Sequence, residues 1–187
     1  MRRLTMFNFI TLNGFYKGPN GDISWHQHGG GEEAEFSREG VGAGNTLLFG
    51  RVTYEMMARV WPSPDAMKNM PEMAEGMNKA DKIVFSMTLK KAEWNNTRLV
   101  RDNMVEEVRK MKQMPGKDLT ILGSGSIVTQ LTDAGLIDEY QFMMDPVALG
   151  AGTSLFQSMR YPLNLKLASS RIFKSGTLLL NYVPLEK

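Results

Sequence analysis

The sequence predicts an α/β protein with a mostly parallel central sheet, helices on both faces of that sheet and an antiparallel C-terminal edge. Short apolar runs of strand length alternate with segments of helical apolar spacing as far as Gly135. From Asp138 onward, strand-like runs follow one another without a helix between the last two. The chain shows no internal repeat and no linker, so we expect a single domain over residues 1–187.

The first half of the chain begins with a strand. Aromatic and β-branched residues predict a strand over Leu4–Thr11, which ends before the turn dipeptide Asn13-Gly14. A polar, glycine-rich segment continues to Gly31, and its length makes it a candidate active-site lid. Thr46–Phe49 predicts the next strand, and a helix is expected to follow Gly50.

The second half contributes further strands and helices. Lys82–Ser86 and Leu119–Leu122 have the composition of short buried strands. Asn103, with Glu106 three positions later, resembles the start of a helix, and a later helix is expected to end at Gly135. The last three strands are expected over residues 140–147, 163–173 and 177–183, with a hairpin turn at 174–176.

Two strand-to-helix turns have the composition of anion-binding sites. Gly50-Arg51-Val52-Thr53 combines the N–H groups of a helix start with a guanidinium and a hydroxyl. Gly123-Ser124-Gly125-Ser126 provides glycines that allow close backbone approach, together with hydroxyls. Ordinary α/β turns also use glycine and serine in these positions, so each turn either holds a phosphate or only begins a helix.

Composition and motifs exclude several classes of protein. The chain has no cysteine, which excludes a disulfide framework, a thiolate zinc site and a cysteine nucleophile. Its net charge of +2 is too small for a nucleic-acid-binding polyelectrolyte. No apolar stretch approaches the ~20 residues that cross a bilayer, and the first residues read as a strand rather than a signal peptide. We therefore expect a cytoplasmic protein without nucleic-acid or membrane partners.

Common nucleotide and hydrolase motifs are also missing. Val128 stands where the dinucleotide fingerprint G-x-G-x-x-G has its third glycine, and there is no P-loop or G-x-S-x-G elbow. His26 and His28, with Glu32 and Glu33 nearby, could bind a metal, but a solvated loop pair is the preferred interpretation. We expect no metal site.

Several ordered segments together resemble the dihydrofolate-reductase-like superfamily, and more narrowly the group related to the reductase domain of the bifunctional riboflavin-biosynthesis deaminase–reductase. The resemblance covers the chain from Leu4 to about Val183. The segments that carry it are Thr11–Gly14, Leu48–Glu55, Lys82–Ser86, Leu122–Ser126, Gly135–Tyr140, Pro146–Gly152 and Leu155-Phe156.

The resemblance implies an NADPH-dependent reductase, with NADH as the other cofactor, that passes hydride to a pterin-like or aminopyrimidine heterocycle. The alternative is a nicotinamide-dinucleotide-binding module that does not catalyse a reaction. The cofactor-binding residues implied by the resemblance are Gly50, Arg51, Thr53, Ser86, Met87, Thr88, Gly123, Ser124, Gly125, Ser126 and Ile127.

For the substrate, the resemblance implies binding by Asn13 and Trp25 and catalysis by Glu32 and Glu33. Members of the group often carry arginine where Met87 stands, and methionine cannot bind a 2′-phosphate, which weakens the preference for NADPH. Members also commonly pair through their C-terminal strands, so we expect a homodimer.

Overall fold

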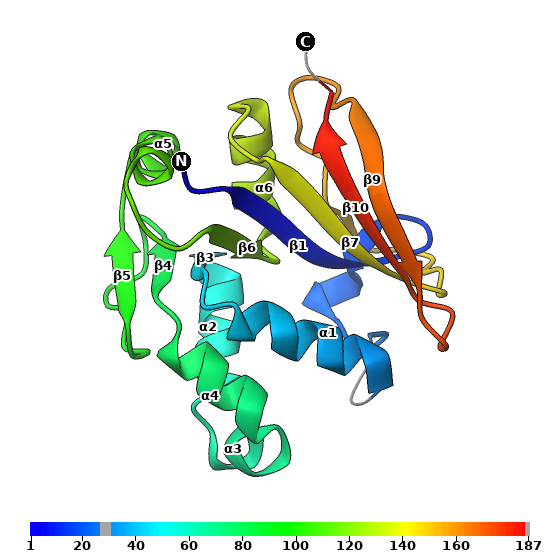
Figure 1. The fold of residues 1–187 in the computed structure, drawn as a ribbon, viewed down its shortest axis with the longest axis horizontal. Helices are drawn as coiled ribbons and strands as arrows, with labels where there is room; N and C mark the ends of the chain where they lie inside the picture. Colours follow the sequence, from blue (N-terminus) through cyan, green and yellow to red (C-terminus); the bar gives the residue numbers. More distant parts are fainter. Residues whose placement is uncertain (27–30, 186–187) are drawn as a thin grey trace.

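The computed structural model describes residues 1–26 and 31–185. Its main feature is an eight-stranded sheet with the strand order β5-β4-β3-β6-β1-β7-β10-β9 (Figure 1). All neighbouring pairs from β5 to β7 are parallel. The strands are β1 (Leu4–Thr11), β3 (Thr46–Gly50), β4 (Lys82–Phe85), β5 (Thr97–Val100), β6 (Leu119–Leu122), β7 (Glu139–Asp145), β9 (Leu165–Ile172) and β10 (Leu178–Pro184).

The central strand β1 divides its side chains between two cores. Leu4, Met6 and Ile10 are buried in the larger core, which α5 and α6 also line. Phe7 and Phe9 point to the other face, where they pack against a smaller buried group that includes Phe173. This two-residue period is what a strand with both faces covered requires.

Helices cover both faces of the sheet, as predicted (Figure 1). Helices α5 (Met104–Gln113) and α6 (Gly125–Asp133) lie on one face. On the other face lie α1 (Gly31–Gly42), α2 (Arg51–Val60), α3 (Pro64–Asn69) and α4 (Pro71–Lys79). Within the described residues, no helix is long and apolar enough to cross a membrane.

The C-terminal edge is antiparallel, which confirms the expectation from the last three strand-like runs. Strand β10 pairs antiparallel with both β7 and β9. The hairpin between β9 and β10 turns at Gly176, whose φ of 89° lies in the region that glycine adopts without strain. β9 is therefore an outer strand of the sheet.

Three local features differ from the sequence-based expectation. The first loop contains the strand β2 (Phe15–Lys17), which pairs with β8 (Thr153–Ser154), and a short 3-10 helix, η1 (Pro19–Gly21). Strand β5 was not anticipated, because its few half-exposed residues carry little pattern. The helix start predicted at Asn103 is confirmed, because α5 begins at Met104, but Asn103 has a φ of 52° and its side chain makes no capping hydrogen bond.

Candidate functional site

The two predicted anion-binding turns lie side by side. They follow β3 and β6, which are parallel neighbours in the sheet. The N–H of Gly50 donates to Ser124 Oγ at 2.9 Å, so the first turn is bonded directly to the second. A Cβ added to Gly123 would lie 3.3 Å from Thr53 Cγ2, closer than most side chains tolerate. The turns thus form one corner at the carboxyl ends of the strands, where ligands of open α/β sheets bind.

The start of α6 presents free donors at this corner. Ile127 and Val128 donate their N–H groups to the Ser124 carbonyl. In the part of the chain that the structure describes, the N–H groups of Gly125 and Ser126 donate no hydrogen bond. Such donors at a helix N-terminus suit a phosphate or diphosphate. The donor set therefore fits the diphosphate of a nicotinamide dinucleotide.

Tyr16 of β2 is a neighbour of this corner that the sequence did not reveal. A Cβ added to Gly125 would lie 2.8 Å from the Tyr16 hydroxyl, so the ring packs directly against the start of α6. An aromatic residue shortly after the Asn13-Gly14 turn is the signal that could have identified it. Any ligand at the start of α6 has to share this space with Tyr16.

A cleft of about 640 Å³ opens beside Arg51, between the start of α2 and the loop after β4. Arg51 Nη1 lies 2.9 Å from Glu55 Oε2, so the guanidinium is already paired within its helix. Lys90 and Lys91 also line the cleft. Met87, which stands where the family often has arginine, is 81% exposed. Lysines thus provide positive charge that Met87 does not.

The loop after β4 is held by its own polar groups. Ser86 Oγ accepts hydrogen bonds from the N–H groups of Thr88 and Leu89, at 3.2 and 2.9 Å. The two terminal nitrogens of Arg101 donate to the carbonyls of Leu89 and Lys90, each at 2.9 Å. Ser86, one of the predicted cofactor-binding residues, therefore shapes the loop after β4.

The two residues predicted to bind substrate have different roles in the structure. The side chain of Asn13 bonds to Leu149, donating to its carbonyl at 2.7 Å and accepting from its N–H at 3.2 Å. It thereby ties the first loop to the loop after β7. Trp25 is half-buried, and its Nε1 has no hydrogen-bond partner among the residues that the structure describes. A buried donor of that kind is suited to a ligand acceptor.

A network of polar side chains, of which Glu33, Asp145 and Thr177 are buried, adjoins Trp25. His26 Nδ1 lies 2.7 Å from Asp145 Oδ2, and Thr177 Oγ1 donates to Asp145 Oδ1 at 3.2 Å. Ser175 Oγ accepts the N–H of Thr177 at 3.1 Å and donates to Glu33. Glu33 and Asp145 are 5% and 3% exposed. The first loop, α1, β7 and the β9–β10 hairpin thus meet in one hydrogen-bonded group.

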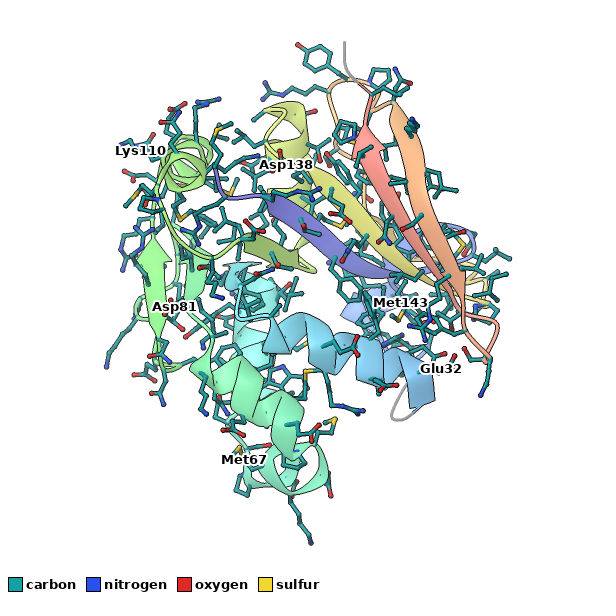
Figure 2. All side chains as sticks on the ribbon, viewed as in Figure 1. Glu32, Met67, Asp81, Lys110, Asp138 and Met143 are labelled. Atoms are coloured by element: carbon teal, nitrogen blue, oxygen red, sulfur yellow. The ribbon has the colours of Figure 1, made fainter. Side chains whose placement is uncertain are left out.

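The two predicted catalytic carboxylates, those of Glu32 and Glu33, have different surroundings in the structure. Glu33 is buried in this network, whereas Glu32 is half-buried and makes no hydrogen bond or ion pair within the described ranges. Figure 2 labels Glu32 at the start of α1, below Met143 of β7. Sequence reasoning missed His26 as a partner of Asp145 and gave Asp145 no role.

The metal hypothesis finds no support in the geometry of the described residues. His26 is paired with Asp145, and Glu33 bonds to Ser175. In residues 1–26 and 31–185, no group of three or more histidine or acidic side chains is arranged to hold a metal ion. His28 lies outside the described residues.

Aromatic rings surround the polar network on the α1 face of β1. The His26 ring lies over Phe9, with the ring centroids 3.6 Å apart and the planes 31° apart. Phe7 contacts both Phe9 and Phe36. An apolar wall with a few polar groups is typical of a small-molecule site.

Residues 2–179 match the model of the RibD C-terminal domain. The chain belongs to the RibD C-terminal domain family. One relative is the uncharacterized protein YyaP of Bacillus subtilis (strain 168). It is 31% identical over 181 residues, which cover 97% of this chain and 94% of YyaP.

Two solved structures support the same fold for this RibD C-terminal domain protein. The Thermotoga maritima diaminohydroxyphosphoribosylaminopyrimidine deaminase/5-amino-6-(5-phosphoribosylamino)uracil reductase has a TM-score of 0.70 at 14% identity, covering 98% of this chain and 57% of that one. Dihydrofolate reductase from Enterococcus faecalis, complexed with NADP(H) and RAB-propyl, has a TM-score of 0.65 at 18% identity, covering 98% and 97%. The fold is dihydrofolate-reductase-like, and the predicted resemblance is confirmed.

Proposed function

We propose that this protein is a reductase that uses NADPH to transfer hydride to a small pterin-like or aminopyrimidine heterocycle. The observation that carries the proposal is the direct bond between the two anion-binding turns, from the Gly50 N–H to Ser124 Oγ at 2.9 Å. That contact joins a cationic helix start to a second helix start with free N–H groups. A diphosphate linking two nucleosides is the ligand that such a corner fits best.

Each part of the corner has a distinct task in this proposal. Gly125 and Ser126 would donate their N–H groups to the diphosphate, and Arg51 would exchange Glu55 for a phosphate. The bound cofactor supplies the hydride. The aromatic wall of Phe7, Phe9 and Phe36 would hold the acceptor heterocycle next to β1. The first loop, which packs against α6 through Tyr16, would exclude water.

Thermal shift with NADPH and with NADH tests cofactor binding directly. A ligand at about a hundred times its dissociation constant stabilises a fold by about 2.7 kcal/mol. NADPH should therefore raise the melting temperature. Oxidation of NADPH should then be followed by absorbance with dihydrofolate and a panel of pterins and aminopyrimidines.

Arg51→Ala provides the matched variant, with Arg59→Ala as its control. Arg51 lines the cleft, whereas Arg59 lies in the last turn of the same helix. Losing one charge-assisted contact should weaken NADPH binding by about tenfold in Arg51→Ala and leave Arg59→Ala at the wild-type level. A protein that binds neither cofactor contradicts the proposal. Binding without turnover on the whole panel identifies a non-catalytic module.

A further inference from the structure

The best-organised polar group outside the cofactor corner is the pair formed by His26 and Asp145. Asp145 is the last residue of β7 and lies opposite Thr11 of β1 in the sheet register. It is therefore at the carboxyl end of the strand next to β1, on the same side of the sheet as Phe7 and Phe9. Strand β6, which leads into the cofactor corner, borders β1 on its other side. The pair and the corner thus flank one strand.

Asp145 fixes how the His26 ring is oriented. An ionised carboxylate can only accept hydrogen bonds, so Nδ1 carries the hydrogen in the 2.7 Å contact. Thr177 donates to the second oxygen of the same carboxylate and holds its plane. The ring is also stacked on Phe9, which limits its rotation. A carboxylate at one ring nitrogen sets the tautomer and makes proton exchange occur at the other.

We infer that His26 donates the proton of the reduction and that Asp145 positions it. This inference rests on the proposed function, because reduction of a C=N bond needs a hydride on carbon and a proton on nitrogen. In the step assigned here, the Nε2–H bond of the imidazolium breaks and an N–H bond forms on the heterocycle. Its electron pair stays on Nε2, which leaves a neutral imidazole that solvent protonates again. The proton source is therefore a histidine rather than Glu32 or Glu33.

The surroundings of His26 suit an acceptor heterocycle. The imidazole lies against the Phe9 ring, and its centroid is 6.0 Å from that of the Trp25 ring. Trp25 Nε1, which has no hydrogen-bond partner in residues 1–26 and 31–185, provides a donor on the neighbouring residue. The His26 side chain is 18% exposed, compared with 4% for Asp145. The proton donor is thus the more exposed member of the pair, and its positioning residue is buried.

His26→Gln tests the assignment by separating binding from turnover. With the acceptor of the panel that the wild type reduces fastest, kcat should fall by about a hundredfold, the usual contribution of a general acid. The thermal shift with NADPH should be unchanged, because His26 is not part of the cofactor corner. Added imidazole should restore part of the kcat of His26→Ala. A His26→Gln variant with wild-type kcat overturns the assignment of His26 but leaves the proposed function standing.

Asp145→Asn tests the positioning residue, and Asp138→Asn is its matched control. Asp138, labelled in Figure 2, precedes β7 at its other end and pairs with Lys112. Asp145→Asn should lower kcat while NADPH binding is kept, and Asp138→Asn should affect only stability. Equal kcat values in the two variants contradict the positioning role. A wild type without NADPH-dependent turnover overturns the proposed function and this assignment together.

Nuclear magnetic resonance gives a readout that does not depend on turnover. The chain contains two histidines, so His26→Gln assigns both imidazoles. The ¹⁵N spectrum of neutral His26 should show the tautomer with hydrogen on Nδ1. Asp145→Asn should reduce the population of that tautomer. Folic acid, used as a heterocycle probe, should shift the His26 signals. A tautomer with hydrogen on Nε2, or no response to folic acid, contradicts the assignment.

Discussion

At the scale of single residues, Lys90 is the side chain best placed to decide cofactor preference. It lines the same cleft as Arg51 and Lys91. Arg51 is paired with Glu55, and Lys91 Nζ lies 3.4 Å from Glu93 Oε1. Lys90→Ala should therefore weaken NADPH binding by several-fold, about 1 kcal/mol, and leave NADH binding unchanged. Titration of both cofactors followed by fluorescence measures this. Equal weakening for NADPH and NADH contradicts a 2′-phosphate contact.

Lys82 is a second residue with a measurable effect, this time on stability. It is 1% exposed, and its Nζ donates to the carbonyls of Met77 and Ala80 at the end of α4. Burial lowers the pKa of Lys82 from 10.5 to about 8, although the charge of Asp81 opposes this. Between these values the unfolded chain binds the proton and the folded chain does not. The free energy of unfolding should therefore rise with pH across this window, by up to about 3 kcal/mol.

Urea unfolding from pH 8 to 10 measures that slope. Lys82→Met should remove this slope, and Lys79→Met, which changes the exposed last residue of α4, should keep it. The series ends at pH 10 because burial raises the pKa of Tyr140 from 10 to about 12. Between these two values the folded chain binds the proton and the unfolded chain does not, so the free energy of unfolding falls as the pH rises. A slope that is the same in Lys82→Met and the wild type would show that another group titrates.

At the scale of elements, the contact between the two helix starts has its own energetic signature. Ser124 Oγ accepts the N–H of Gly50, and this pair is buried. Ser124→Ala leaves that N–H without an acceptor, which should lower the free energy of unfolding by about 1–3 kcal/mol. Ser126→Ala, an exposed position in the same turn, should leave stability unchanged. Chemical denaturation of the three proteins compares them.

The same elements show how far the sequence could predict the molecule. β1 and the helices after Gly50 and Gly123 were predictable because apolar periodicity and glycine at strand ends are local signals. Their contact was not, since 74 residues separate Gly50 from Ser124. The His26–Asp145 pair spans 119 residues, and neither side chain follows a motif. β5 and the pairing of β2 with β8 were missed because a few half-exposed residues carry no period.

At the scale of the whole molecule, we propose that β9 is the surface through which two copies pair. It is an outer strand of the sheet, and Leu167 and Ile172 are 47% and 75% exposed. An exposed apolar edge strand is a site for pairing with another chain. Light scattering should therefore give twice the 21.0 kDa of one chain.

Leu167→Lys with Ile172→Lys should convert that dimer to a monomer, because charge on an edge strand opposes pairing. Lys166→Glu, on the same strand, keeps a charge at an exposed position and serves as the control. A wild type with the mass of one chain contradicts the proposal.

The anchoring of the loop after β4 by Arg101 has a consequence for how cofactor choice can change among relatives. Arg101 binds the backbone carbonyls of Leu89 and Lys90, not their side chains. The path of the chain is thus fixed independently of which amino acids occupy those positions. Substitutions there can alter the charge that a ribose phosphate meets while the loop keeps its shape. The preference for one cofactor over the other can therefore change, by evolution or by engineering, through substitutions in this loop that leave its backbone unchanged.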